Sequence, residues 1–265
     1  MCLIALAWRQ HPHWPLAIAA NRDEFHARPT EAAGIDPEDP SVYGGRDLVQ
    51  GGGWLQVSTR GRLAAVTNVR DGRNGLAAQP RSRGWLVRDF VRGRDSAGAF
   101  AAGPASLPGY GHFNALFWDG DALVHASNHP DVRHAAVSPG MHAMSNGAFD
   151  AAWPKSVAAT QALEAWLAAT PGLEASTGSM DALEPLIAAL ADTRVAPDEA
   201  LPDTGVGIAL ERALSPPFVS GPEYGTRCSS VVLVASDHIL FAERRHGPGG
   251  VRAGEGIARI PLCRD

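Results

Sequence analysis

The residues that could carry out chemistry lie near the start of the chain. The sequence opens with Met1 and Cys2, and a polar quartet, NRDE at 21–24, directly follows an apolar run. Because the cysteine side chain is small, removal of Met1 is expected, and it would leave Cys2 with an unblocked α-amine. The reference pKa of such an amine, about 7.7 to 8.0, suits a general base near neutral pH. Cys2 would then supply both the nucleophile and the base for acyl transfer.

The quartet is placed beside Cys2 by a predicted hairpin. The apolar runs CLIALAW at 2–8 and WPLAIAA at 14–20 are joined by a short connection that contains a proline, which is typical of antiparallel strands. If the turn lies at residues 11 and 12, opposite residues have numbers that sum to about 23. The hairpin therefore predicts that Cys2 faces Asn21 and that Leu6 faces Ala17.

Two residues of the quartet would support a nucleophile at Cys2. Arg22 would favour a nearby thiolate through its positive charge, and Asp23 could accept hydrogen bonds from the protonated amine and fix its direction. The alternative is a buried strand cysteine beside a solvated turn. The residues alone leave both interpretations open.

Two asparagines are candidates for stabilising an oxyanion. Asn68 and Asn146 each follow an apolar run and a small hydroxyl residue, in VTN and MSN. An amide at a strand end can donate a hydrogen bond to the oxyanion that develops in acyl transfer. Asn128, in ASN, has the same local form, and each of the three could instead close a turn through its side chain.

The elements that position these residues follow from the hydrophobic pattern. Runs without polar alternation predict strands covered on both faces, at 2–8, 14–20, 62–68, 113–118, 122–127, 141–146, 229–235 and 238–244. Helical patterns lie at 82–93, 154–169 and 179–192, and the proline-rich stretch 194–222 predicts a long ordered loop. Few helices and many hairpins indicate an α+β fold in which largely antiparallel sheets pack on each other beneath outer helices.

Composition narrows the class of protein. The chain has 265 residues, 45% of them hydrophobic, and we expect a single domain over 1–265. A net charge of −5 without a Lys/Arg block argues against nucleic acid or an anionic membrane as a partner. No stretch reaches the roughly twenty apolar residues of a membrane span, so small molecules or proteins remain as partners.

The cysteines and the N-terminus indicate a compartment. The three cysteines, Cys2, Cys228 and Cys263, have no metal-like spacing, so neither a disulfide framework nor a metal site is predicted. The opening run at 2–8 has no basic leader and no small-residue cleavage site. We expect a reducing, cytoplasmic location.

Several motifs, in order along nearly the whole chain, resemble the NRDE family, also called the transport and Golgi organisation 2 family. They are MCLIALAW, NRDEF with ARP, GGGWLQVSTRGRLAAVTN, SRG, FNALFWD, the segment 140–146 ending in MSN, WPK, and YGTR followed by SSVVLV. The resemblance implies a four-layer αββα sandwich of the N-terminal-nucleophile (Ntn) hydrolase type, similar to choloylglycine hydrolase and penicillin V acylase. GGGWL has glycine where GGTWL is common, a departure that does not touch Cys2 or the quartet.

The resemblance also implies site residues. In the wider hydrolase group a cysteine after the initiator Met is supported by an Arg and an Asp on the next strand, by oxyanion-site asparagines and by a late Arg. Carried over by position, these are Cys2, Arg22, Asp23, Asn68, Asn146 and Arg227. Arg227 corresponds to the late Arg by order alone.

Two functions follow from the sequence. One is hydrolysis of a small amide or other acyl C–N bond through a Cys2 thioester, which needs no cofactor. The alternative, implied by the family's link to intracellular haem mobilisation, is binding and delivery of haem or another amphipathic ligand. Candidate axial ligands are His11, His13, His129 and His142, and candidate contacts for an anionic ligand tail, unless they form a solvated helix face, are Arg81, Arg83, Arg88, Arg92 and Arg94. The oligomeric state is not predicted.

Overall fold

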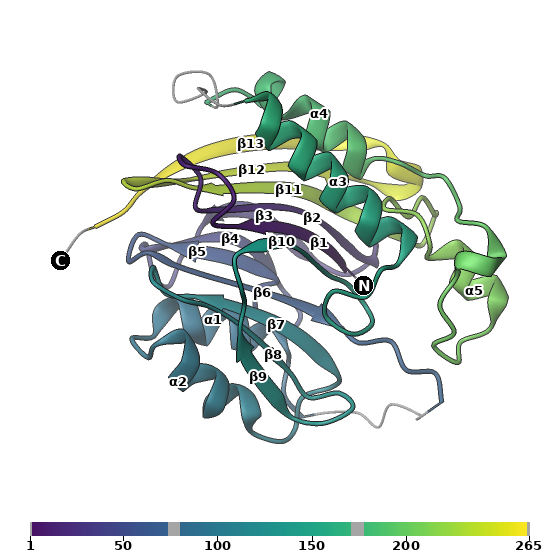
Figure 1. Ribbon diagram of the computed structural model, residues 1–265, viewed down its shortest axis with the longest axis horizontal. Helices are drawn as coiled ribbons and strands as arrows, with labels where there is room; N and C mark the ends of the chain where they lie inside the picture. The colour runs from purple at the N-terminus through teal and green to yellow at the C-terminus, as the bar shows by residue number, and fades with distance from the viewer. Residues whose placement is uncertain (1, 74–79, 171–177, 264–265) are drawn as a thin grey trace.

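Two antiparallel β-sheets lie face to face in the computed structural model, with helices on both outer surfaces (Figure 1). The structure describes residues 2–73, 80–170 and 178–263. The α+β sandwich predicted from the sequence is confirmed, as is the predicted hairpin of β1 and β2. The strands predicted at 113–118 and 122–127, and at 229–235 and 238–244, also pair as hairpins. Within the described residues, no helix has the length and apolar character needed to cross a membrane.

The first sheet carries the start of the chain. It has six strands in the order β10-β1-β2-β11-β12-β13, and each neighbouring pair is antiparallel. Their bounds are β1 (Cys2–Trp8), β2 (Leu16–Phe25), β10 (Gly140–Met144), β11 (Tyr224–Val234), β12 (His238–His246) and β13 (Arg252–Pro261).

The second sheet is a meander in which consecutive strands pair. Its seven strands follow the order β3-β4-β5-β6-β7-β8-β9. Their bounds are β3 (Thr30–Ile35), β4 (Val42–Asp47), β5 (Leu55–Ser58), β6 (Arg62–Asn68), β7 (Phe113–Trp118), β8 (Leu123–Ser127) and β9 (Arg133–Ala136).

Helices cover the outer face of each sheet, which explains why most strands are apolar on both sides. Figure 1 shows α3 (Pro154–Ala169) and α4 (Met180–Leu190) over the six-stranded sheet and α1 (Gly84–Arg92) and α2 (Ala97–Ala102) against the other. α5 (Ile208–Ala213) lies apart from both pairs. Burial of apolar surface in three layers of side chains stabilises this arrangement.

The register of the first hairpin differs from the prediction by one residue. Cys2 pairs with Arg22 and Leu6 pairs with Ile18, so the expected pairing of Cys2 with Asn21 was wrong. The connection between β1 and β2 centres on Pro12, not between residues 11 and 12. Since a shift of one residue exchanges the faces of a strand, the shift changes which members of the quartet share a face with Cys2: Arg22 and Glu24 instead of Asn21 and Asp23.

The quartet itself lies inside a strand. β2 continues to Phe25 and pairs along its whole length with β11, so residues 21–24 do not follow the strand end as the sequence suggested. Arg22 belongs to the face that packs between the sheets, on which Ile18 lies. Ala19 belongs to the face beneath α3 and α4, and Asn21 and Asp23 follow it in alternation.

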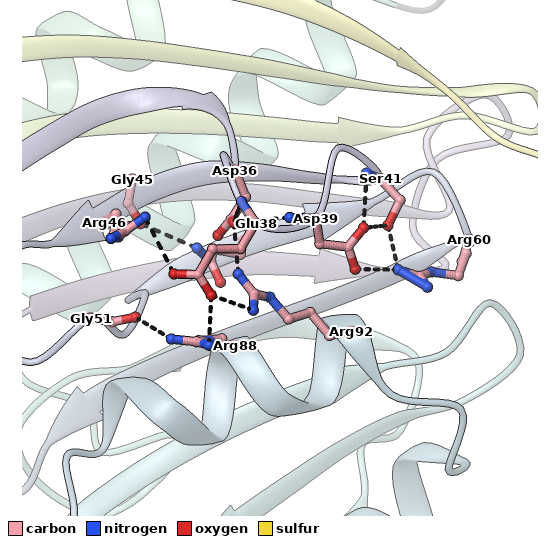
Figure 2. A network of polar contacts seen from close by, with 11 residues as sticks. Asp36, Glu38, Asp39, Ser41, Gly45, Arg46, Gly51, Arg60, Arg88 and Arg92 are labelled. Carbon is pink, nitrogen blue, oxygen red and sulfur yellow. Dashed lines mark hydrogen bonds and ion pairs between the residues drawn. The ribbon is translucent and has the colours of Figure 1, made fainter.

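The arginines of α1 form ion pairs with an acidic connection between two strands (Figure 2). Arg88 Nη2 lies 2.9 Å from Glu38 Oε2, and Arg92 Nη2 lies 2.6 Å from Asp36 Oδ1. Arg46 Nη1 lies 3.8 Å from the same Glu38 carboxylate. These contacts fasten the connection between β3 and β4 to the helix, so Arg88 and Arg92 already have carboxylate partners.

Candidate functional site

Cys2, Arg22 and Asn146 come together at one end of the first sheet. Cys2 begins β1 and lies opposite Arg22 of β2. On the other side of β1, Ile4 pairs with Met144, and Asn146 follows two residues later, at the end where β1 begins. Two of the predicted site residues therefore come from adjacent strands and a third follows the next strand of the sheet. Met1, whose removal the mechanism requires, lies outside the described residues.

Arg22 is held in the layer between the sheets. Its side chain is 7% exposed, and its Nη2 lies 3.7 Å from Glu24 Oε2. The guanidinium carbon lies 4.3 Å from the centroid of the Trp54 ring, a favourable cation–π geometry. Its Nη1 is buried and has no hydrogen-bond partner among the described residues. A buried donor in this state is costly unless it finds an acceptor, so Arg22 is suited to bind one at this position.

Asp23 lies on the opposite face, beneath the helices. It is 2% exposed, and its Oδ1 accepts a 2.7 Å hydrogen bond from Thr226 Oγ1. Burial raises the pKa of Asp23, while the charge of Lys155 and the Thr226 hydrogen bond act in the other direction. Lys155, from the first turn of α3, is 3% exposed and donates to the Leu214 carbonyl oxygen at 3.1 Å.

Lys155 is a further candidate for the site, and sequence reasoning missed it. The WPK motif contained it, but a lysine at a helix start is usually a solvated residue. A buried ammonium whose field acts on a buried carboxylate marks a candidate functional site, and only the fold brings the two groups together.

The two oxyanion candidates lie next to each other although they belong to different sheets. Asn146 is fully buried and its Nδ2 donates to the main-chain oxygen of Asn68 at 2.8 Å. The main-chain oxygen of Asn146 accepts from the Arg70 amide at 2.8 Å. One N–H of the Asn146 amide thus joins the two sheets, while the amide oxygen Oδ1 is buried without a hydrogen-bond partner among the described residues.

Asn128 has a different role. Its Oδ1 accepts from the Phe113 amide at 2.9 Å, and its Nδ2 donates to the carbonyl oxygens of Tyr110 and Gly111 at 3.3 Å. These bonds fasten the segment before β7 to the end of β8. Asn128 therefore closes a loop through its side chain, which was the alternative interpretation of the three asparagines.

A buried network holds the segment that carries Asn146. Asn114 Nδ2 donates to the Gly147 carbonyl oxygen at 2.7 Å, and Thr67 Oγ1 donates to the Ser145 carbonyl oxygen at 2.6 Å. Asn114 Oδ1 lies 3.1 Å from His125 Nε2, which requires the ring nitrogen to donate. Sequence reasoning missed these residues because they lie in mid-strand, where the pattern indicates only core.

A cavity opens beside this end of the sheets. Its volume is about 760 Å³, and Asn68 and Glu24 lie on its wall. The remaining lining is mostly apolar, and much of it comes from the segment 194–222, including Val195, Leu210 and Phe218. This segment was predicted to be a loop throughout, but it contains the helix α5, to which Leu210 belongs. A concave, largely apolar space with a few polar groups is typical of a small-molecule site.

Arg227 lies on the Arg22 side of the site. It occupies an irregularity in the pairing of β11 with β2, and its Nη1 donates to the carbonyl oxygens of Phe25 and Arg28 at 2.9 and 3.1 Å. Burial and the charge of Arg22 lower the pKa of Arg227. Both arginines line a smaller cavity of about 150 Å³ that also includes Cys228.

The histidines named as candidate axial ligands are dispersed. His11 and His13 lie in the connection between β1 and β2, with ring centroids 5.7 Å apart. His142 already contacts Asp150 Oδ2 and the Ser138 carbonyl oxygen, both at 2.8 Å. His129 lies at a third place, 3.2 Å from Asp71.

Comparison with known proteins identifies the family. The family model described as Transport and Golgi organisation 2 matches residues 1–248. The chain belongs to this family. It is 34% identical over 268 residues to the Transport and Golgi organization protein 2 homolog of Bos taurus, and 32% identical over 267 residues to that of Homo sapiens. Each alignment covers 92% of this chain and 92% of the relative.

Solved structures confirm that this member of the Transport and Golgi organisation 2 family has the fold of Ntn hydrolases. The Caenorhabditis elegans N-acylethanolamine-hydrolyzing acid amidase ortholog has a TM-score of 0.53 at 9% identity, covering 88% of this chain and 92% of the amidase. The C2A mutant of the conjugated bile acid hydrolase from Clostridium perfringens has a TM-score of 0.51 at 7% identity, covering 98% of this chain and 92% of the hydrolase. At these identities the likeness concerns the fold, and chemistry must be argued from the site.

Proposed function

We propose that this Transport and Golgi organisation 2 family protein hydrolyses a small amide or related acyl C–N bond, with Cys2 as nucleophile after removal of Met1. The observation that carries the proposal is the pairing of Cys2 with Arg22 at the sheet end where Asn146 follows β10. An adjacent, mostly apolar cavity supplies room for an acyl group.

The proposed reaction has two steps, acylation of Cys2 and hydrolysis of the resulting thioester. The α-amine of Cys2 takes the thiol proton, the thiolate attacks the carbonyl carbon, and the C–N bond breaks as that proton passes to the leaving amine. Water then attacks the thioester, giving a carboxylic acid and restoring the thiol. Asn146 and Asn68 donate hydrogen bonds to the oxyanion in both steps.

Arg22 and Asp23 have separate tasks in this scheme. The buried Arg22 guanidinium stabilises the thiolate through its charge. Asp23, on the other face of β2, accepts a hydrogen bond from the protonated α-amine and orients it, and the charge of Lys155 favours the ionised carboxylate against the effect of burial. Arg227 adds positive charge on the Arg22 side.

The neighbouring structures support this choice of reaction class. One is a hydrolase of N-acylethanolamines, and the other is a hydrolase of conjugated bile acids whose solved form is altered at a cysteine in position 2. By analogy of fold, the substrate of this protein would join an apolar acyl group to an amine. The cavity lining favours such an acyl group.

Intact mass with peptide mapping, followed by a substrate screen, tests the proposal. We expect loss of Met1, selective labelling of Cys2 by a thiol reagent at mildly acidic pH, and turnover of an N-acyl amide that Cys2→Ala abolishes. Cys263→Ala, at an exposed cysteine, is the matched control and should retain full activity. Retention of Met1 together with an inert Cys2 would remove the base and refute the mechanism.

A second function, non-catalytic carriage of haem or another amphipathic ligand, is favoured by the same cavity of about 760 Å³. No histidine is among the described residues that line it, so haem would bind there through apolar contacts. A Soret shift on titration of haem into wild-type and Cys2→Ala protein alike would support carriage. An unchanged Soret band at micromolar protein would exclude haem as the cargo.

A further inference from the structure

Two histidines and an aspartate form a cluster outside the proposed hydrolase site. Asp71 follows β6, His112 precedes β7 and His129 follows β8, so the sheet gathers them at one end. One ligand atom from each, two imidazole nitrogens and a carboxylate oxygen, all lie within 4.8 Å of one another. The His129 Nε2 to Asp71 Oδ2 distance is 3.2 Å, and the two imidazole ring centroids are 4.6 Å apart.

The cluster is partly shielded from water and incompletely satisfied. The Asp71 side chain is 7% exposed and that of His129 is 28% exposed. His112 Nδ1 is buried and has no hydrogen-bond partner among the described residues. A buried ring nitrogen in that state is costly, and a bound cation would satisfy it.

We propose that Asp71, His112 and His129 bind a first-row divalent metal ion such as Zn²⁺. Imidazole nitrogen with a carboxylate oxygen is a ligand set that Zn²⁺ and its neighbours in the series prefer. In a tetrahedral zinc site with bonds near 2.0–2.1 Å the ligand atoms are roughly 3.4 Å apart, so only small side-chain rotations would bring the three into place.

The proposed ion would keep an open coordination position. Three protein ligands leave a fourth for water or an anionic oxygen. Asp71 and His129 line a cavity of about 410 Å³ whose wall also includes Arg70, Arg73 and Arg133. Asp203 also lies on this wall and pairs with Arg73, and Arg70 pairs with Glu211. The charge of Arg133 favours a carboxylate or phosphate oxygen at the open position.

The proposed ion would also brace the segment that carries Asn146. Gly147 and Ala148 line the same cavity, and the Arg70 amide, next to Asp71, donates to the Asn146 carbonyl oxygen. Metal binding would therefore join the segments after β6 and β8 to the one before β7 and rigidify the support of Asn146. The metal proposal rests on its own residues and does not require hydrolysis by Cys2.

Zinc titration of chelator-treated full-length protein tests the proposal. We expect one Zn²⁺ per chain by calorimetry and affinity reduced at least about tenfold in His112→Gln, His129→Gln and Asp71→Asn. His134→Gln, at an exposed histidine of β9, is the matched control and should bind like wild type. No binding by wild type, or equal binding by all three cluster variants, would overturn the proposal.

Two measurements on wild-type protein avoid reliance on variants that fail to fold. Zn²⁺ should protect His112 and His129, but not His134, from a histidine-modifying reagent, as mapped by mass spectrometry. The Co²⁺ complex should lack the charge-transfer absorption of a cobalt–thiolate bond. Protection elsewhere, or a thiolate band, would assign the metal to other residues and refute this site.

Discussion

Cys2 lies directly opposite Arg22 in the antiparallel pairing of β1 with β2. The stacking of Arg22 on Trp54 and the burial of its Nη1 fix the guanidinium between the sheets. A fixed positive charge favours the ionised form of a thiol beside it. The proposed hydrolysis assigns that effect on the Cys2 thiol to Arg22.

Substitution of Arg22 tests that route. Arg22→Gln should raise the pKa of the Cys2 thiol, slow its alkylation at pH 6 and lower kcat/KM by about 100-fold, since the charge beside the thiolate is lost. Arg22→Lys should give an alkylation rate and a kcat/KM between those of wild type and Arg22→Gln, because lysine keeps the charge but lacks the planar group that stacks on Trp54. Alkylation rate against pH, followed by mass spectrometry, measures the effect. Arg244→Gln, which removes an arginine paired with Glu184, should leave the profile unchanged.

Asp23 and Lys155 are expected to be energetically coupled. Lys155→Met should raise the pKa of Asp23 further and reduce the free energy of unfolding by about 3 kcal/mol, because removing one charge leaves the other buried without compensation. Asp23→Asn should reduce the free energy of unfolding by a similar amount. In the double variant the reduction should be clearly smaller than the sum of the two single reductions. Urea unfolding of the four proteins gives the coupling energy.

The control for that cycle is the exposed pair Arg244 and Glu184, whose carboxylate is 50% exposed. Its coupling is expected to stay within about 0.5 kcal/mol. Strictly additive effects of Asp23→Asn and Lys155→Met would show that the two side chains act independently and would remove Lys155 from the site.

The sequence predicted the parts of the fold that are apolar on both faces. The runs that form β1, β7 and β11 are covered by a sheet on one side and helices on the other, so their pattern is unambiguous. β9 is exposed along its length, and β3 is exposed or half-buried. Such edge strands resemble polar loops, because their position depends on partners that the local pattern does not reveal.

The site was predictable where it depends on local geometry or on a motif in the sequence, as for Asn68 and Asn146. A hairpin necessarily brings the quartet near Cys2, so Arg22 and Asp23 followed from the sequence, although the register was wrong by one residue. The supports of Asn146 were not predictable. Asn114 and Thr67 contact the segment 145–147 from the other sheet, and the cluster of Asp71, His112 and His129 forms only when β6, β7 and β8 align.

Asn114 is expected to be a positioning residue for Asn146. Asn114→Ala leaves the Gly147 carbonyl oxygen and the His125 ring without their partner, so the free energy of unfolding should fall by about 2 kcal/mol. Activity on a confirmed amide should fall mainly in kcat, because the oxyanion donor is displaced. Asn128→Ala breaks comparable bonds to the segment before β7 and should reduce stability but spare kcat. Equal kcat losses in both variants would indicate a general effect of destabilisation.

His125 is expected to make stability depend on pH. Burial and the charge of Arg133 lower the pKa of His125 to about 4, against the opposing effect of Asp150. The unfolded state, with an ordinary histidine pKa near 6.5, binds more protons between these values, so stability is fully present above about pH 6.5 and is lost as pH falls toward 4. His125→Gln should reduce that loss by about 2 to 3 kcal/mol, measured by urea unfolding at pH 7 and pH 4.5. The exposed His134→Gln should follow the wild-type profile, and an unchanged profile in His125→Gln would assign the acid sensitivity to other groups.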